Sequence, residues 1–271
     1  VTLILLLIAL AGPRLISQET IRKTEGIDIV LTVDTSTSMS AEDFTLNSQR
    51  VNRLEIVKRV VSDFIAQRQN DRIGLVAFAA QAWTVTPLTT DYAWLQTNLE
   101  RITFGIIKDG TSIGPAIMTS IARLQSSTAK SKVVILLTDG ADGGTKIDPL
   151  EAAKVAKSFG IKIYTIGAGS DGEVAVPVSI FGRKVFMPQR FEIDEELLKE
   201  VALSTGAKYY RATGTQELRK IYKEIDELEK TEIEEIGFLE YTELFDRFLI
   251  AALALSLAGT LLENTLLMRL P

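Results

Sequence analysis

Five side chains with oxygen atoms stand where the chain leaves a strand-like segment or enters a helical one. They are Asp34, Ser36, Ser38, Thr111 and Asp139. The first three follow the apolar run 27–33, Asp139 follows the run 133–138, and Thr111 precedes a helical pattern. Because ligands of a doubly wound sheet bind outside the carboxyl ends of its strands, these side chains can converge on one edge. Oxygen donors suit a hard cation such as Mg²⁺ or Mn²⁺, with one position left for a carboxylate from outside.

Each of these residues alone also has an ordinary structural explanation. A serine-rich turn after a strand usually caps a helix, Thr111 can cap the helix that follows it, and Asp139 can belong to a turn. Asp142 adds a further carboxylate near the site, and we interpret it as a turn residue rather than a group that tunes metal affinity. The shared order and the shared sheet edge favour the metal site.

The composition excludes most other chemistry. The 271 residues include no cysteine and no histidine, which excludes disulfides, zinc–thiolate sites, Ser-His triads and histidine-bound metals. The 30 Lys and Arg against 35 Asp and Glu give a net charge of −5, which argues against a nucleic-acid partner. Carboxylates, hydroxyls, amides and amines are the groups that remain.

Short β-branched runs alternate with helical patterns, which predicts an α/β fold with a doubly wound, mostly parallel sheet. The expected strands are 27–33, 73–79, 133–138 and 161–166, with 83–88 as an antiparallel edge strand. Helices are expected over the apolar stripes 54–65, 113–124 and 218–228, and between Asp148-Pro149 and Gly160. Residues 173–187 interrupt the alternation and predict an inserted β-hairpin that turns at 181–184; its ordinary role would be to cover a sheet edge.

Both ends of the sequence are apolar, and the charge lies between them. Residues 1–12 are expected to be the C-terminal part of a transmembrane helix, and residues 244–268 a second transmembrane helix. Between them we expect a linker over 13–25, the α/β domain over 26–230 and an acidic stalk over 231–243.

Two other interpretations of the ends stay open. The first run can be a signal-peptide core ahead of Ala9-Leu10-Ala11, or both runs can be buried core helices. Arg269, just past the second run, favours a cytoplasmic tail.

Asp-x-Ser-x-Ser at 34, 36 and 38, a later Thr111 and Asp139 after a buried strand together resemble a known metal centre. It is the metal-ion-dependent adhesion site of the von Willebrand factor type A (VWA) domain. The resemblance implies that Ser36, Ser38 and Thr111 bind Mg²⁺ or Mn²⁺ directly. It implies direct or water-bridged roles for Asp34 and Asp139.

Longer segments between 26 and 230, such as GIDIVLTVDTSTSM and ILLTDGADGG, are similar to the membrane-anchored bacterial BatA/BatB (aerotolerance) proteins. In that group a membrane helix lies on each side of a periplasmic domain, which implies an inner (cytoplasmic) membrane protein. Such proteins are encoded beside MoxR-type AAA+ ATPases. The resemblance therefore implies a MoxR-type ATPase, and other VWA or membrane proteins, as partners. Thr37 departs from the family, whose loops often have Gly at this position.

We therefore expect a binding protein rather than an enzyme: a membrane-anchored module that captures an acidic residue of a partner protein through the metal. One alternative is a scaffold in which the terminal helices and the hairpin form a membrane oligomer. Another is a Mg²⁺-dependent phosphohydrolase with Asp34 as nucleophile. Such enzymes commonly need a second acid two residues later, and this chain has Ser36 there.

Overall fold

The computed structural model describes residues 2–17, 26–46, 49–106, 108–143, 146–169, 173–180, 183–231 and 240–265. The chain divides into two compact units. One is Thr24–Glu234, and the other combines Val1–Lys23 with Glu235–Pro271. Each unit is described below by itself.

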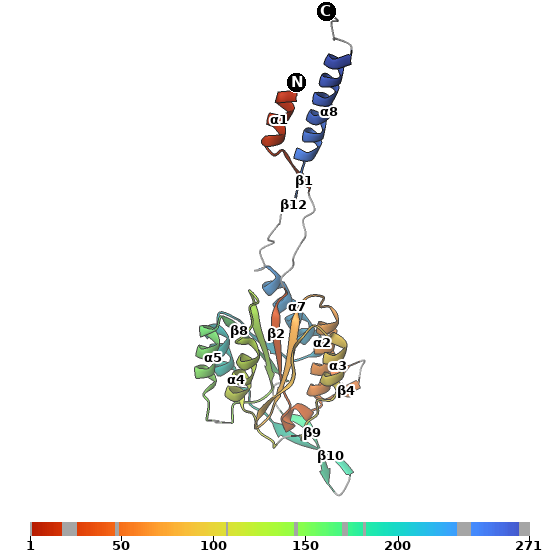
Figure 1. Cartoon of the computed structure of the whole chain (residues 1–271). Helices are drawn as coiled ribbons and strands as arrows, with labels where there is room; N and C mark the ends of the chain where they lie inside the picture. Colours follow the sequence, from red (N-terminus) through yellow and green to blue (C-terminus); the bar gives the residue numbers. More distant parts are fainter. Residues whose placement is uncertain are drawn as a thin grey trace, which may run out of the picture. The chain divides into compact units, whose positions relative to one another are not determined.

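A six-stranded sheet forms the centre of the larger unit, in the order β11-β8-β7-β2-β5-β6 (Figure 1). Its strands are β2 (Asp28–Asp34), β5 (Arg72–Phe78), β6 (Ala82–Thr89), β7 (Lys132–Thr138), β8 (Ile161–Ala168) and β11 (Tyr209–Ala212). β6 pairs antiparallel with β5, and every other neighbouring pair is parallel. The predicted doubly wound fold and its antiparallel edge strand are confirmed.

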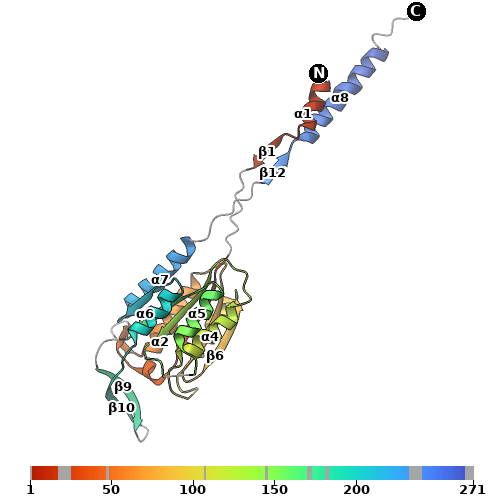
Figure 2. The ribbon, with the colours of Figure 1, turned by 90° about the vertical axis from the view of Figure 1, so that its left-hand side faces the viewer.

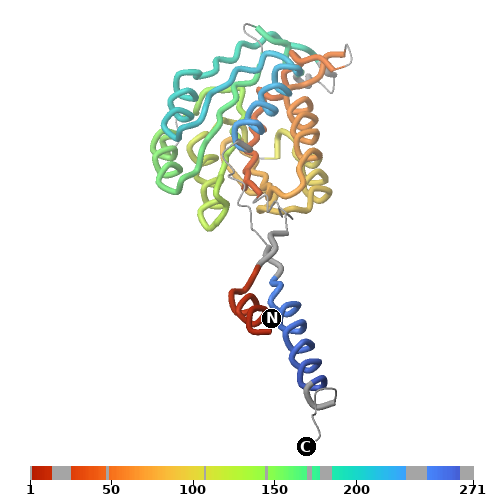
Figure 3. The backbone as a smooth tube through the Cα atoms, turned by 90° about the horizontal axis from the view of Figure 1, so that it is seen from above, coloured from red at the N-terminus to blue at the C-terminus, as the bar shows by residue number. Residues whose placement is uncertain are grey.

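Helices cover both faces of this sheet (Figures 2 and 3). They are α2 (Arg53–Ala66), α3 (Tyr92–Glu100) and α7 (Thr215–Thr231) on one face, and α4 (Ile113–Leu124), α5 (Pro149–Ser158) and α6 (Glu195–Ser204) on the other. The alternation of β2 explains the two layers, because Leu31 and Val33 face the first core while Val30 faces the second. A strand buried on both faces needs this continuous apolar run.

The two ends of α5 show how the local sequence determines where a helix begins and ends. The Asp148 side chain accepts a hydrogen bond from the Leu150 backbone N–H at 2.7 Å, and Pro149 occupies the first helical position. Gly160 follows the helix with a φ of +66°, a left-handed conformation that favours glycine.

Three elements of the sheet and its layers are not apparent from the sequence pattern: α3, α6 and β11. α3 buries only Leu95 and Leu99, so its apolar stripe is too short to show a helical period. β11 has four residues at the sheet edge, of which only Ala212 is fully buried. Short, half-exposed elements give a weak periodic signal.

The predicted hairpin is present as β9 (Glu173–Ile180) and β10 (Arg183–Arg190), paired antiparallel. β10 continues three residues beyond the predicted end at 187. The two strands form a sheet of their own and do not extend the central one. Val174 and Val176 of β9 pack against Ala41, beside the short helix η1 (Thr37–Ser40), rather than over a sheet edge. The hairpin projects from the end of the unit at which β8 finishes (Figure 2).

The smaller unit contains α1 (Thr2–Leu10) and α8 (Phe245–Thr265), which lie against each other. β1 (Arg14–Ser17) pairs antiparallel with β12 (Glu240–Glu243), a pairing that the sequence did not predict. Within α8, Phe245–Leu262 is long and apolar enough to cross a membrane. Much of the predicted linker and acidic stalk, residues 18–25 and 232–239, lies outside the described residues, and the domain boundaries stay a prediction.

Candidate metal centre

The direction of the chain crossovers changes between β2 and β7, the two central strands of the sheet. From β2 the chain moves through α2 to β5 and β6, and from β7 it moves the other way, through α5 to β8. Ligands of open α/β sheets bind at such a switch point, outside the carboxyl ends of the strands. Asp34 ends β2 and Asp139 directly follows β7, so both stand at this point.

Hydrogen bonds join four of the five predicted residues into one chain. Asp34 Oδ1 accepts from the Ser36 backbone N–H at 2.8 Å and from Ser36 Oγ at 2.6 Å. Ser36 Oγ and Ser38 Oγ lie 2.9 Å apart, and Ser38 Oγ donates to Asp139 Oδ1 at 2.6 Å. The second oxygen of Asp34 accepts from Thr138 Oγ1 at 2.6 Å. The sequence prediction that these side chains converge is therefore realised in the geometry.

The fifth residue, Thr111, lies beside Ser36 and Ser38 but belongs to the loop before α4. A shallow recess of about 310 Å³ is lined by Ser36, Ser38 and Thr111, among others. Thr111 Oγ1 lies 3.2 Å from the position that a Cβ on Gly140 would take, so glycine keeps this approach open. Behind the hydroxyls, the side chains of Asp34 and Asp139 are fully buried.

The ordinary explanation of Thr111 and Ser112, that they cap α4, does not hold. Ser112 Oγ donates to the Ala80 carbonyl at 2.7 Å instead. The Ile113 N–H donates to Asp142 Oδ1 at 2.9 Å, so Asp142 caps α4 from the loop after β7. Within the described part of the chain, the Thr111 hydroxyl has no hydrogen-bond partner. Asp142 thus has the structural role that we expected, although as a helix cap rather than within a turn.

Burial perturbs both carboxylates. It raises the pKa of Asp34 from 3.8 to about 7, helped by the charge of Asp139 and opposed by the hydrogen bonds from Ser36 and Thr138. Burial also raises the pKa of Asp139, while the Arg53 guanidinium opposes this rise. Two buried carboxylates this close cost free energy when both are ionised, unless a cation compensates them. The donor set of buried carboxylates and hydroxyls therefore fits a hard divalent cation.

Arg53, at the start of α2, is a functional candidate that sequence reasoning missed. Its side chain is 2% exposed, and its Nη1 donates to Asp139 Oδ2 at 2.7 Å. The other side of the guanidinium pairs with Asp43, with Nη2 2.6 Å from Oδ2. Both carboxylate oxygens of Asp139 thus accept a hydrogen bond, Oδ1 from Ser38 and Oδ2 from Arg53. An arginine at the first position of an amphipathic helix has no distinguishing signal in the sequence.

Asp109 also lines the recess. Its Oδ1 accepts from the Thr37 backbone N–H at 2.8 Å and so ties the loop before α4 to the serine loop. Burial is the largest single effect on the pKa of Asp109 and acts to raise it, but the hydrogen bonds from Thr37 and Gly110 together outweigh burial and hold the pKa below its ordinary value. Asp109 stays ionised at neutral pH and adds negative charge to the recess.

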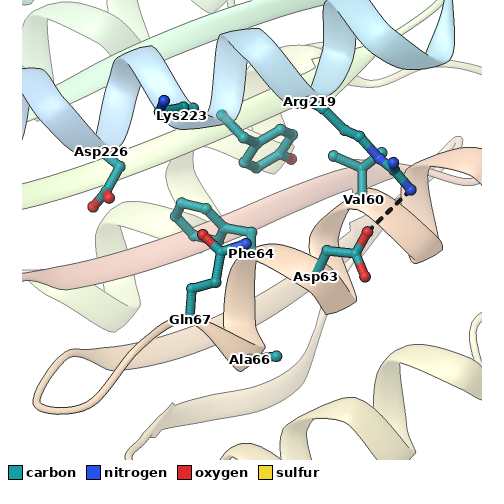
Figure 4. Close-up of a pocket in the computed structure, with 9 residues that line it drawn as sticks. Val60, Asp63, Phe64, Ala66, Gln67, Arg219, Lys223 and Asp226 are labelled. Atoms are coloured by element: carbon teal, nitrogen blue, oxygen red, sulfur yellow. Dashed lines mark ion pairs between the residues drawn. The ribbon is translucent and has the colours of Figure 1, made fainter.

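A larger recess of about 460 Å³ lies between α2 and α7, away from these residues (Figure 4). An ion pair crosses it, with Arg219 Nη2 3.2 Å from Asp63 Oδ2. The floor is aromatic, because the Phe64 and Tyr222 rings pack edge to face at 5.1 Å. None of the predicted metal ligands lines it, so its size does not make it the candidate site.

Comparison with known proteins agrees with this geometry. The family model of the von Willebrand factor type A domain matches residues 28–224. A relative from Borreliella burgdorferi, described as an uncharacterized protein, is 31% identical over 92% of this chain and 72% of its own length. The crystal structure of BatB from Bacteroides thetaiotaomicron is 28% identical, with a TM-score of 0.64 over 76% of this chain and 100% of that one. An aerotolerance-related membrane protein from Bacteroides fragilis is 26% identical, with a TM-score of 0.63 over 77% and 100%.

Proposed function

Because this chain belongs to the von Willebrand factor type A domain family, we propose that it is a metal-dependent protein-interaction module. In this proposal Ser36, Ser38 and Thr111 hold Mg²⁺ or Mn²⁺ through their hydroxyls. Asp34 and Asp139 hold it directly or through water. One observation supports it above the others: three hydroxyls line a recess with two fully buried carboxylates behind them.

The cation would compensate the negative charge of the buried carboxylates of Asp34 and Asp139. Mg²⁺ takes about six oxygen ligands and gives up its water reluctantly, so five protein residues leave room for water or for an outside carboxylate. We infer that an Asp or Glu of a partner protein takes that place. The partner's charge and the metal's would then be desolvated together, which costs less than burying either one alone.

The geometry favours binding over hydrolysis. Asp34 is fully buried, and both of its oxygens accept hydrogen bonds, one from Ser36 and one from Thr138. A nucleophile must approach the reacting atom to about 3 Å with an available lone pair. This side chain is instead held as a structural acceptor, so we do not assign it the nucleophile role of a phosphohydrolase.

The place of action is also part of the proposal. α8 is consistent with membrane anchoring, and one of the similar structures is described as a membrane protein. We propose that the module is anchored in the bacterial inner membrane with its domain on the periplasmic side. There it would serve an envelope assembly or chaperone-like complex linked to a MoxR-type AAA+ ATPase. A membrane oligomer built through the terminal helices is compatible with this role.

Titration calorimetry on the full chain in detergent tests the metal site. Ser38→Ala and Thr111→Ala each remove one hydroxyl at the recess, and both should weaken Mg²⁺ and Mn²⁺ binding at least tenfold. Asp194→Ala is the matched control, because Asp194 caps α6 through the Leu197 N–H and does not line the recess. Undiminished metal binding in both recess variants would show that the site is assigned wrongly.

A further inference from the structure

The β9–β10 hairpin presents large apolar side chains to solvent. Val185, Phe186 and Met187 are consecutive in β10 and are 41%, 49% and 49% exposed. Because adjacent residues of a strand point to opposite faces, apolar surface is offered on both sides of the ribbon. Exposed apolar clusters with polar surroundings mark interaction sites in soluble domains.

This apolar segment is continuous with the candidate metal centre. β10 runs from these residues directly to Gln189 and Arg190, which line the recess together with Ser36 and Ser38. At about 3.3 Å per residue, Phe186 and Arg190 are about 13 Å apart along the strand. One extended segment of a few residues can therefore reach both the recess and the apolar part of the hairpin.

The hairpin is held firmly to the loop that carries the serines. Val174 and Val176 are buried against Ala41, three residues after Ser38. At the same end of the ribbon, Phe191 packs against this cluster directly after β10, and the Arg53 guanidinium carbon lies 5.5 Å from the centre of its ring. Arg53 in turn pairs with Asp139. These contacts fix the distance between the hairpin and the predicted metal ligands.

The charge of the hairpin and the hydrogen-bonding capacity of its backbone limit the kind of partner that it can bind. In sequence, the hairpin 173–190 includes Arg183, Lys184 and Arg190 against one acidic residue, Glu173, although the whole chain carries −5. A basic segment beside a cation site favours an acidic partner. Pro177 and Pro188 interrupt the N–H row of both strands, so strand addition at an open edge is disfavoured. Contact through side chains remains as the means of binding.

We propose that this hairpin selects the partner: it takes an acidic segment of another protein with an apolar side chain about four residues from the carboxylate that reaches the metal. The inference rests on the proposed metal-dependent function and adds the identity of the second contact. The apolar side chain would pack on Phe186 and its neighbours, while further acidic residues would lie near Arg190.

Peptide selection on the full chain in detergent tests the proposal. A displayed library of random peptides of about twelve residues is selected with Mg²⁺ present, and the affinities of enriched peptides are measured for wild type and variants. We expect enriched peptides to combine Asp or Glu with an apolar residue. Phe186→Ser should weaken them about tenfold or more, as expected for losing a buried aromatic contact. Phe159→Ser is the matched control, because Phe159 is 41% exposed at the end of α5, near the amino end of β8.

The possible failures are distinguishable. Peptides that lose binding in EDTA and in Ser38→Ala but not in Phe186→Ser would overturn the hairpin inference and leave the metal function standing. Peptides that need Phe186 but bind equally in EDTA would overturn the metal function and, with it, the acidic anchor proposed here. If Phe186→Ser instead converts a discrete oligomer to monomer in light scattering, the hairpin is a contact between copies of this chain and the proposal is wrong. A selection that enriches no peptide also counts against it.

Discussion

Replacing Asp34 with asparagine should stabilise the metal-free domain at alkaline pH and destroy its response to metal. Asparagine has almost the same shape, and its carbonyl can accept the hydrogen bonds that Ser36 now donates. It carries no charge, so it removes the repulsion between the buried carboxylates of Asp34 and Asp139. The variant therefore separates the cost of the charge from the shape of the site.

The magnitude follows from the pKa of Asp34. Because the pKa is raised in the folded protein from 3.8 to about 7, the protonated side chain favours the folded state and the ionised one opposes it. The stability that Asp34 contributes is present below pH 3.8 and is lost as the pH rises to about 7. The full loss corresponds to about 4 kcal/mol, at about 1.4 kcal/mol for each pH unit. At pH 8 in EDTA, Asp34→Asn should exceed wild type by up to this amount, and at pH 4 the two should differ little.

Tryptophan fluorescence during urea unfolding of the full chain in detergent measures this difference. The chain has two tryptophans, and both Trp83 in β6 and Trp94 in α3 belong to the larger unit, so the signal does not report on α8. Mg²⁺ should raise the stability of wild type at pH 8 and leave Asp34→Asn unchanged. Parallel stability curves for the two proteins from pH 4 to pH 8 in EDTA would refute the reasoning, because the buried charge would then carry no cost.

Three further substitutions test the supports of the site by the same unfolding assay. Arg53→Met leaves the carboxylates of Asp43 and Asp139 without their buried partner and should cost about 3–5 kcal/mol, part of which Arg53→Lys recovers; an unchanged midpoint would contradict the role of the pair. Asp142→Ala removes the cap of α4 and should cost about 1 kcal/mol, while calorimetry should show metal affinity nearly unchanged; a complete loss of binding would make Asp142 a ligand instead. Gly169→Ala places a Cβ 2.7 Å from Arg53 Cζ, at a residue with a φ of +137°. It should therefore destabilise the domain and, by displacing Arg53, weaken Mg²⁺ binding. Wild-type values in both measurements would argue against tight packing of Arg53 on Gly169.

The convergence of the proposed metal ligands could be predicted because these residues stand at positions that the strand pattern defines. Once 27–33 and 133–138 are recognised as buried parallel strands, the residues that follow them must share an edge of the sheet. Arg53 could not be found this way, since its bond to Asp139 joins residues 86 apart and depends on how α2 packs. The cap of α4 shows the same limit: Ser112 has the right type and position, yet Asp142, 29 residues later than Ile113, makes the hydrogen bond.

The hairpin shows the opposite case, in which an element was predicted but its surroundings were not. The alternation in 173–187 indicates a two-stranded ribbon, because turn residues separate two β-prone runs. Whether such a ribbon covers a sheet edge or lies beside a loop depends on tertiary contacts of Val174 and Val176 with Ala41. Those contacts join segments more than 130 residues apart in sequence, which no local pattern encodes.

The position of β2 also decides how the domain carries mechanical load. The serine loop directly continues β2, and the amino end of the same strand continues the segment that precedes the domain. In the proposed function, tension from a partner bound at the recess would run lengthwise along β2, which is hydrogen bonded to β5 on one side and to β7 on the other. Sliding this strand out requires both ladders to shear at once, and Arg72 Nε, 2.8 Å from Asp28 Oδ1, clamps its starting end. If the proposed function holds, β2 is thus the strand of the domain best placed to resist a pull along its own axis.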